Sequence, residues 1–520
     1  MFMDVSFINI ENNIIVFLVY LVFKFLYNSI CFDMERIKRL LVVLMAVVAL
    51  CASGQVDRPK LIVGLVVDQM RWDYLYNYQW GEGGFKTLLH DGYRCNNTII
   101  DYVPTVTAAG HSSIYTGSTP AFHGIAGNNF MLNGKNVTSV QDDSERAVGG
   151  NEKTRGKSPR NLITTTIADQ LLLATKFKSR CVGIALKDRA AILPAGHHPV
   201  GAYWYDGNSK SFVTSTYYMD KLPRWVADFN KRHRDELASD VYNLPAGTTL
   251  TFALAEQALI NEKLGQGEVT DMLAISVSNT DMCAHYYGTH SPKVDSIYQQ
   301  LDKEIAHFIE LLDQRIGRGN YLLFLSADHG GTHSHPRMTS HGLPSGCWHN
   351  PDALIAANEL LEKQFGVKRL LKEEMEYTFY LNHEAIDSAR LDYDKVMKTA
   401  CHALELPEEI QWAIDVARID TYPIPSILKE RIKLGYFPER SGEIYVVPRT
   451  GVYAGKTEWA GSNHGTWSQS DSHIPLIFMG WHVTPGETSR LTHMTDIAAT
   501  VCAMLHIQAP NACIGTPIFE

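Results

Sequence analysis

The chain has 520 residues, of which 45% are hydrophobic and 20% charged, and its formal net charge is -9 at pH 7. These values are typical of an ordinary globular protein, and the length suits one large α/β domain with insertions, or two domains. No basic block stands out, which argues against nucleic acid as a general partner, and any site for an anion must be made locally.

The first 54 residues are not expected to belong to the folded domain. Residues 34–39 (Met-Glu-Arg-Ile-Lys-Arg) are basic, residues 40–50 are apolar, and residues 51–54 (Cys-Ala-Ser-Gly) are small. This order is typical of a secretory signal peptide, and the apolar run is too short to span a bilayer comfortably. We therefore expect the true start to be Met34 and the mature chain to cover 55–520, with no stable membrane span. The mature protein is expected in the periplasm or outside the cell, either free or anchored at the surface. A second apolar stretch at 14–26 leaves a real N-terminal membrane anchor as the alternative.

Five apolar runs, rich in valine, isoleucine and leucine, predict buried parallel strands. They are residues 61–67, 181–186, 272–277, 321–325 and 474–479. A long amphipathic helix is predicted at 291–316, between the third and fourth runs, and a final helix at about 495–505. This alternation indicates an α/β fold, in which ligands bind beyond the carboxyl ends of the strands.

Two stretches do not follow this alternation. Residues 190–250 are rich in aromatic side chains, and residues 340–455 mix helices with short strands. We expect both to be insertions that form a cap over the active edge of the sheet. The seven cysteines after residue 54 have no Cys-x-x-Cys spacing, so buried free thiols are expected, with Cys502 and Cys513 as the one pair considered for a local disulfide.

Six residues of the types that bind metal ions follow predicted strands or stand in a glycine-containing loop. They are Asp68, Asp281, His285, Asp328, His329 and His464. Each alone has an ordinary alternative, such as a helix cap for Asp68 or a solvated loop position for His464. Their order, placement and chemical types agree together, and three carboxylates with three imidazoles suit two zinc ions. A hydroxyl between two such ions is a nucleophile for phosphoryl transfer.

Thr107 is the candidate nucleophile. It precedes Ala-Ala-Gly-His-Ser-Ser-Ile-Tyr-Thr-Gly, a sequence that can start a helix. Free backbone N–H groups and the positive end of the helix dipole favour an alkoxide and an incoming phosphate at such a place. A plain N-cap role is the alternative for Thr107, and Thr105 is the nearby competitor.

The segment Val-Thr-Ala-Ala-Gly-His at 106–111, followed by His-Gly-Ile-Ala-Gly-Asn at 123–128, resembles two motifs of the alkaline phosphatase superfamily. The threonine-nucleophile members of this superfamily are the nucleotide pyrophosphatase/phosphodiesterases and the PafA-type bacterial alkaline phosphatases. The phosphodiesterases among them carry Lys-Thr-Phe-Pro-Asn-His and His-Gly-Ile-x-x-Asn. The resemblance selects Thr107 as the nucleophile and adds Asn128, while Ala109 replaces a proline without removing a chemical group.

The resemblance implies a three-layer αβα sandwich around a mostly parallel sheet, with two bound zinc ions. One zinc would be held by Asp281, His285 and His464, and the other by Asp68, Asp328 and His329. Thr107 would bind the second zinc when deprotonated, attack phosphorus in line and form a phosphothreonine that water then hydrolyses. Asn128 would donate a hydrogen bond to a nonbridging phosphoryl oxygen.

Lys187 and Arg189 follow the predicted strand at 181–186, where the PafA-type monoesterases have a Lys-x-Arg pair that contacts the phosphate. A monoester carries one more negative charge on its nonbridging oxygens than a diester, so two cations aimed there favour the monoester. An ordinary charged turn is the alternative for this pair.

We therefore predict an exported, zinc-dependent alkaline phosphatase with broad specificity for small-molecule phosphate monoesters, acting as a monomer. A nucleotide pyrophosphatase/phosphodiesterase on the same core is the alternative enzyme, and a catalytically silent binding protein on this fold is the non-enzymatic alternative. A sulfatase is not expected, because the region of Thr107 has no Cys-x-Pro-x-Arg segment.

Overall fold

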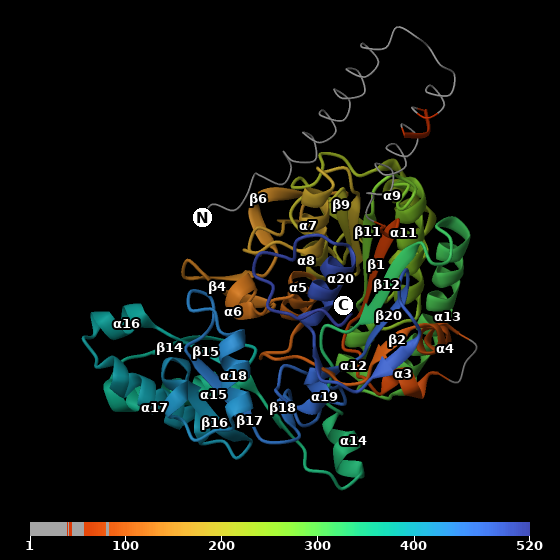
Figure 1. Cartoon of the computed structure of the whole chain (residues 1–520). Helices are drawn as coiled ribbons and strands as arrows, with labels where there is room; N and C mark the ends of the chain where they lie inside the picture. Colours follow the sequence, from red (N-terminus) through yellow and green to blue (C-terminus); the bar gives the residue numbers. More distant parts are fainter. Residues whose placement is uncertain (1–38, 40, 44–56, 80–82, 520) are drawn as a thin grey trace. The chain divides into compact units, whose positions relative to one another are not determined.

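Buried strands form the centre of the molecule (Figure 1). The computed structural model describes residues 39, 41–43, 57–79 and 83–519, and Arg58–Glu520 is one compact unit. The expected start at Met34 and nearly all of the expected leader lie outside the described residues. Within the described part of the chain, no helix combines the length and the apolar character that crossing a membrane requires.

The central sheet has eleven strands in the order β21-β2-β20-β12-β1-β11-β8-β9-β10-β6-β7. Their bounds are β1 Leu61–Val67, β2 Tyr93–Cys95, β6 Gln141–Val148, β7 Arg155–Lys157, β8 Cys181–Ala185, β9 Gly201–Asp206, β10 Ser211–Ser215, β11 Asp271–Val277, β12 Tyr321–Ser326, β20 Leu476–Gly480 and β21 Gly486–Thr488. The five strands from β12 to β9 run parallel, and Leu61 of β1 pairs with Asp271 on one side and Tyr321 on the other. The prediction of an α/β fold with a mostly parallel sheet is confirmed.

Helices cover both faces of this sheet and make three layers (Figure 1). One face carries α4 (Gly84–Asp91), α11 (Ala246–Asn261) and α13 (Pro292–Arg315), and the other carries α5 (Thr107–Thr116), α7 (Ile167–Ala174), α8 (Asp188–Ala195) and α20 (Asp496–Met504). The predicted helix at 291–316 is α13. Its cap is Ser291, whose hydroxyl accepts the N–H of Val294, and Pro292 opens its first turn.

The prediction of one parallel strand at 474–479 is wrong in two respects. Pro475 has no N–H for a ladder and separates β19 (His473–Ile474) from β20. β19 pairs with β3 (Thr98–Ile99), outside the central sheet, and β20 pairs antiparallel with β12. Because β20 is covered on both faces, its apolar sequence contains no information about its direction.

Residues 190–250 do not form the expected cap. β9 and β10 continue the central sheet, and α9 (Arg224–Arg232) packs against β10 and α11 before the short α10 (Arg234–Leu237). The aromatic side chains that suggested a cap belong to the core, where Tyr203, Trp204 and Tyr205 are at most 4% exposed. Aromatic residues fit a pleated, buried surface as well as they fit a binding site.

Residues 340–455 fold around a sheet and a buried cluster of their own, coloured teal to blue in Figure 1. We call this part the lobe. Its elements are β13 (Gly346–Trp348), α15 (Asn350–Phe365), β14 (Leu371–Met375), β15 (Thr378–Leu381), α16 (His383–Ser388), α17 (Tyr393–Glu405), β16 (Ile410–Asp415), the 3-10 helix Val416–Thr421, α18 (Ser426–Gly435), β17 (Ile444–Pro448) and β18 (Val452–Ala454). The strand order is β14-β15-β17-β16, and α15 and α17 complete the packing.

Short elements connect these parts. They are α3 (Tyr74–Asn77), α6 (Pro120–His123), β4 (Asn129–Leu132), β5 (Lys135–Thr138), α12 (Asn279–Tyr287), α14 (His335–Ser340), α19 (Gln469–Ser472) and β22 (Thr492–His493). The seven described cysteines are free thiols and six of them are buried, which confirms the expectation, and Cys502 is not joined to Cys513.

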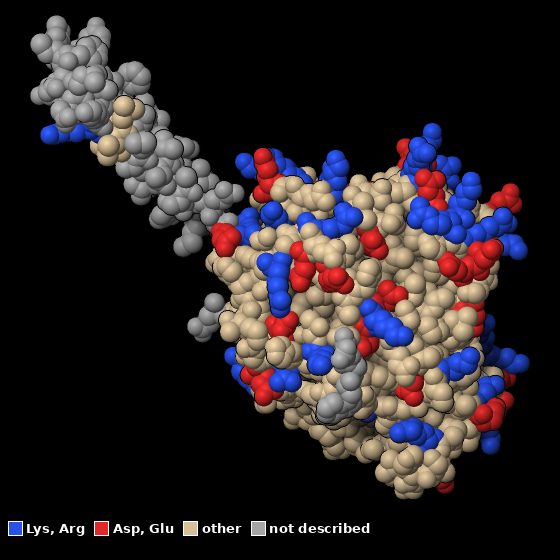
Figure 2. All heavy atoms as spheres, turned by 90° about the vertical axis from the view of Figure 1, so that its right-hand side faces the viewer, with Lys and Arg blue, Asp and Glu red and all other residues tan. Residues whose placement is uncertain are grey.

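Charged side chains of both signs share the surface. On the face shown in Figure 2, lysine and arginine are interspersed with aspartate and glutamate, and apolar or uncharged residues separate them. This face has no broad area of one sign, which agrees with the absence of a basic block in the sequence.

Candidate active site

Three aspartates converge at the carboxyl edge of the sheet. Asp68 directly follows β1, Asp328 lies two positions after the end of β12, and Asp281 stands in the first turn of α12, the helix after β11. Since β1 lies between β11 and β12, these side chains come from three adjacent strands. Each is at most 1% exposed, so the carboxylates are withdrawn from water.

Three histidines surround the carboxylates and share one hydrogen-bonding pattern. The Nδ1 atom of each lies near a backbone carbonyl oxygen: His285 near Ser462 at 3.0 Å, His329 near Gly330 at 2.9 Å and His464 near Thr105 at 2.7 Å. A carbonyl oxygen only accepts, so Nδ1 must carry the proton in each of these bonds. When the ring is neutral, the lone pair then lies on Nε2, as in histidines that bind metals.

The Nε2 atoms face the carboxylates. His285 Nε2 lies 3.1 Å and His464 Nε2 3.5 Å from Oδ1 of Asp281. His329 Nε2 lies 3.6 Å from Asp68 Oδ1 and 3.6 Å from Asp328 Oδ2. The rings of His329 and His464 stack with centroids 3.6 Å apart. The six predicted ligands thus lie together in one buried cluster.

Two groups in this cluster have donor atoms that all lie within 4.8 Å of one another. One group is Asp68, Asp328 and His329, and the other is Asp281, His329 and His464. The first is the set implied by the resemblance, whereas the second contains His329 where His285 was implied. His285 lies beside the second group, because its Nε2 contacts Asp281 and its ring centroid is 5.1 Å from that of His464.

The donor atoms fit divalent cations. Both carboxylate oxygens of Asp68, Oδ2 of Asp328 and Nε2 of His329 are buried without a hydrogen-bond partner. Burial and the neighbouring Asp328 raise the pKa of Asp68 well above its usual range. Burial also opposes ionisation of Asp281, but His285 and Lys187 more than offset it and hold the pKa of Asp281 low. Three crowded carboxylates of this kind require positive charge, which a metal ion supplies.

Lys187 provides one positive charge from the chain itself. Its Nζ lies 2.6 Å from Asp68 Oδ2, without hydrogen-bond geometry, and donates to Asp281 Oδ2 at 2.5 Å and to Thr107 Oγ1 at 3.2 Å. Burial lowers the pKa of Lys187, but the carboxylates of Asp281 and Asp68 outweigh it and the net shift is upward. Lys187 is therefore held as an ammonium group beside the candidate nucleophile.

Arg189 is placed differently from Lys187. Its side chain is 25% exposed, its Nη1 lies 3.6 Å from Asp188 Oδ1, and its Nε is buried without a hydrogen-bond partner. The structure gives it no hydrogen bond to Thr107 or Asn128. Arg189 lines a hollow of about 590 Å³ together with Lys157 and Lys187.

Thr107 is the first residue of α5, and Val106 takes the cap position, so the plain N-cap role is not observed for Thr107. Gly110 allows α5 to pass close to Asp328, because a Cβ atom there would lie 2.2 Å from the Asp328 carbonyl oxygen. The N–H of Ala108 donates to Asn128 Oδ1 at 3.0 Å, which brings Asn128 to the start of the helix.

Thr105 has a structural position. Its hydroxyl donates to the carbonyl oxygen of Thr466 at 3.1 Å and accepts the N–H of Gly465 at 3.2 Å. The hydroxyl is therefore occupied by backbone groups next to His464, which supports Thr107 as the reactive threonine.

Two polar neighbours of the aspartates were not predicted from the sequence. Gln69 Nε2 donates to Asp281 Oδ1 at 2.6 Å, and its backbone N–H donates to Asp328 Oδ1 at 3.1 Å. His111 Nδ1 lies 3.2 Å from Asp328 Oδ2, one helical turn beyond Thr107. Both positions could have been found, because Gln69 directly follows a strand-end ligand and His111 is spaced at i+4 from the nucleophile.

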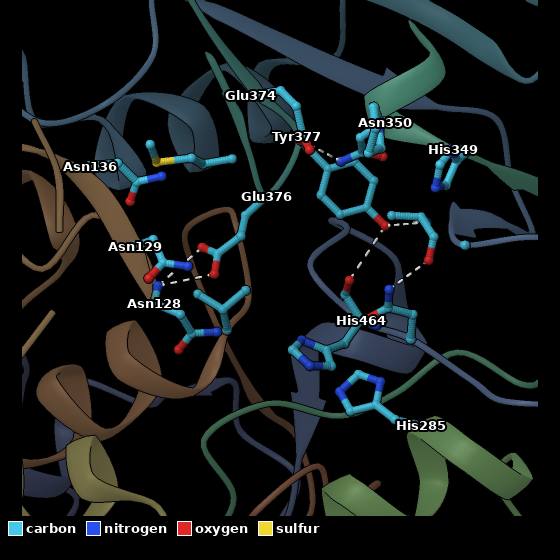
Figure 3. Close-up of a pocket in the computed structure, with 16 residues that line it drawn as sticks. Asn128, Asn129, Asn136, His285, His349, Asn350, Glu374, Glu376, Tyr377 and His464 are labelled. Carbon is cyan, nitrogen blue, oxygen red and sulfur yellow. Dashed lines mark hydrogen bonds between the residues drawn. The ribbon is translucent and has the colours of Figure 1, made fainter. Parts of the chain in front are cut away.

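Two further residues reach the site from the lobe. Glu376 and Tyr377 form the two-residue turn between β14 and β15, with φ of 50° and 74°. The Glu376 carboxylate accepts the Asn128 backbone N–H at 3.1 and 3.2 Å, and burial raises the pKa of Glu376 to about 7. The Tyr377 hydroxyl donates to the His464 carbonyl oxygen at 3.4 Å and accepts the N–H of Ala454 at 2.7 Å (Figure 3).

A sheet edge that carries two buried Asp/His groups beside a helix-borne threonine is the arrangement of enzymes that transfer phosphoryl groups with two metal ions. The family described as type I phosphodiesterase / nucleotide pyrophosphatase matches residues 62–471. The chain belongs to this family, within the alkaline phosphatase superfamily.

Several relatives align over almost their entire length. Alkaline phosphatase PafA of Elizabethkingia meningoseptica is 40% identical over 90% of this chain and 95% of its own. Alkaline phosphatase PhoV of Synechococcus elongatus is 39% identical over 89% and 93%. A protein of Myroides odoratus named calcium-transporting ATPase is 42% identical over 91% and 96%.

Solved structures agree with these relatives. The crystal structure of alkaline phosphatase PafA matches with a TM-score of 0.86 and 39% identity, covering 89% of this chain and 99% of that one. A solved PafA variant has a threonine, an asparagine, a lysine and an arginine replaced, in the order of Thr107, Asn128, Lys187 and Arg189. The spacing agrees between threonine and asparagine and between lysine and arginine, but not between the two pairs. A murine ectonucleotide pyrophosphatase / phosphodiesterase, 15% identical with a TM-score of 0.53, shares the fold.

Proposed function

We propose that this chain is a phosphoric monoester hydrolase of the alkaline phosphatase type, with Thr107 as its nucleophile and two zinc ions as its cofactors. The observation that carries the proposal is the position of Thr107 Oγ1, 3.2 Å from the Lys187 ammonium, which also contacts Asp68 and Asp281 of the two buried Asp/His groups. The relatives named alkaline phosphatase support it, since they are 39 to 40% identical over about nine-tenths of this chain.

Different residues of the site have different roles in the proposed reaction. Thr107 must lose its proton, and the N-terminal end of α5 favours the resulting alkoxide, whereas Lys187 and Arg189 supply positive charge for the nonbridging phosphoryl oxygens. Asn128 accepts the Ala108 N–H through Oδ1, so its amide NH₂ group remains to donate to a nonbridging phosphoryl oxygen. Two divalent cations in the Asp/His groups would supply Lewis-acid stabilisation of the attacking and leaving oxygens.

Zinc suits these groups better than the harder cations do. The donor set mixes imidazole nitrogen with carboxylate oxygen, and each imidazole already has the tautomer that leaves Nε2 free. Magnesium and calcium prefer sites made of oxygen alone.

The basic, apolar and small residues at 34–54 support export. We propose that the mature protein is a monomer in the periplasm or outside the cell.

Replacing Lys187 and Arg189 together by alanine should lower kcat/KM for a phosphate monoester by about 1,000-fold and for a matched diester by less than about tenfold. The reason is the extra negative charge on the nonbridging oxygens of the monoester. Steady-state kinetics on both substrates measures the difference. Lys157→Ala is the matched control, because Lys157 lines the same hollow but pairs with Asp188 at 3.1 Å. Equal losses on the two substrates would refute the role of the pair.

Phosphodiester hydrolysis is the second candidate function. The description of the matching family favours it, since that family is named for phosphodiesterase and nucleotide pyrophosphatase activity. Phosphodiesterase activity would require the same Asp/His groups and Thr107 but not the Lys187/Arg189 pair. The double variant above separates the two functions, because a diesterase would keep its main activity.

A further inference from the structure

A pocket of about 450 Å³ leads from the candidate active site to the lobe (Figure 3). His285, His464 and Asn128 line it on the side of the site, and Asn350 and Glu374 line it on the side of the lobe. In an in-line displacement the leaving alcohol departs opposite to the attacking hydroxyl. Under the proposed function, Asp281, His285 and His464 would hold the metal ion on the side of the leaving alcohol. Because His285 and His464 line this pocket, the alcohol part of the substrate extends into it.

The lining of this pocket is rich in hydrogen-bond acceptors and negative charge. It includes two glutamates, Glu374 and Glu376, and five asparagines, Asn128, Asn129, Asn136, Asn350 and Asn463. Among the described residues that line it, none is lysine or arginine. A second phosphate or a carboxylate on the alcohol would therefore meet like charge, whereas a cationic group would meet opposite charge.

Asn350 presents an acceptor that the protein leaves unpaired. Its side-chain Nδ2 donates to Glu374 Oε2 at 3.2 Å, and a carboxylate only accepts, so this bond fixes the orientation of the amide. Asn350 is 8% exposed, and its Oδ1 is buried without a hydrogen-bond partner. A buried acceptor of this kind is unfavourable unless a ligand donates to it, which points to a donor on the substrate.

We propose that Asn350 and Glu374 bind the ammonium group of an amino alcohol, and that the preferred substrates of this hydrolase are phosphate monoesters of amino alcohols. An ammonium group supplies both the N–H donors that Asn350 Oδ1 lacks and the positive charge that the pocket favours. Hydrolysis breaks the phosphorus–oxygen bond, water provides the oxygen of the released phosphate, and the alcohol oxygen takes a proton. The inference rests on the proposed function and adds the class of alcohol.

Phosphoethanolamine and n-propyl phosphate test the inference, because they differ mainly in a terminal ammonium against a methyl group. Glu374→Gln should lower kcat/KM for phosphoethanolamine by about tenfold and for n-propyl phosphate by less than about twofold. Asn350→Ala should act in the same direction. Glu373→Gln is the matched control: it removes the same charge one residue away on β14, outside the pocket lining, and should change neither substrate. The assay is run at about pH 8.5, where amines stay protonated, because burial raises the pKa of Glu374.

The comparison separates the inference from the proposed function. If the wild-type enzyme hydrolyses both esters and Glu374→Gln lowers both equally, the inference is overturned and the phosphatase assignment stands. If the wild-type enzyme hydrolyses neither ester, both are overturned. Selective loss with phosphoethanolamine, absent in the Glu373 control, is the result that supports the ammonium site.

Discussion

Thr107→Ala should lower the turnover of a phosphate monoester by at least about 10,000-fold while the protein keeps its fold and its bound metal. The expected loss is large because Thr107 supplies the hydroxyl that forms the covalent intermediate. Thr107 contributes only its Oγ1, and the Asp/His groups do not depend on it for their hydrogen bonds. Turnover, circular dichroism and metal content measured on the same preparation test this.

Two threonine variants make this test specific. Thr107→Ser keeps a hydroxyl at the start of α5 and should retain turnover within about 100-fold. Thr105→Val removes the competing hydroxyl, which bonds only backbone groups of Thr466 and Gly465, and should retain turnover within about tenfold. Full activity in Thr107→Ala, or a greater loss in Thr105→Val, would assign the nucleophile to another group.

His464→Ala should remove one of two bound metal ions and lower turnover by at least about 1,000-fold. His464 Nε2 lies 3.5 Å from Asp281 Oδ1, and its ring stacks on His329, so the variant loses a donor from the middle of the cluster. Elemental analysis gives the metal stoichiometry, and kinetics gives the turnover.

Because the chain has 21 histidines, the His464→Ala variant needs a control at a histidine outside the cluster. His307 lies on α13 with a side chain 64% exposed, so His307→Ala removes an imidazole without touching the cluster. We expect it to keep both metal ions and full turnover. An unchanged metal stoichiometry in His464→Ala would refute His464 as a ligand.

The central sheet was predictable because parallel strands between helix layers are apolar on both faces. The run at 61–67 matches β1 to the residue, and Ser291 and Pro292 predict the start of α13. The same property hides the direction of a strand, which is why β20 was assigned wrongly. Buried aromatic residues in β9 suggested a cap insertion, because residue type alone does not show whether a side chain packs in the core or covers a site.

The site was predictable where a functional residue ends a strand or matches a family motif. Asp68 directly follows β1, Asp328 lies two positions after β12, and the motif identifies Thr107 and Asn128. Glu376 and Tyr377 gave no such signal. A two-residue hairpin turn with positive φ at both positions normally has Asn-Gly, and the Glu-Tyr sequence predicts neither the turn nor its contact with Asn128, which is 248 positions away.

Positive φ angles at Glu376 and Tyr377 mark this turn as a contact between the lobe and the residues at the edge of the central sheet. Glu376 contacts Asn128, and Tyr377 contacts the carbonyl oxygen of His464, so one hairpin supports the proposed phosphoryl-binding residue and a proposed metal ligand. Left-handed conformations cost about 1–2 kcal/mol per non-glycine residue and persist where surrounding contacts determine them.

The most direct test of the account is the turnover of a phosphate monoester and a matched diester by the purified protein, after chelation and after zinc is added back. We predict no turnover of either ester after chelation, and a large, zinc-dependent preference for the monoester when zinc returns. A preference for the diester would keep Thr107 and the Asp/His groups but contradict the monoesterase assignment. Turnover that survives chelation would contradict the metal site itself.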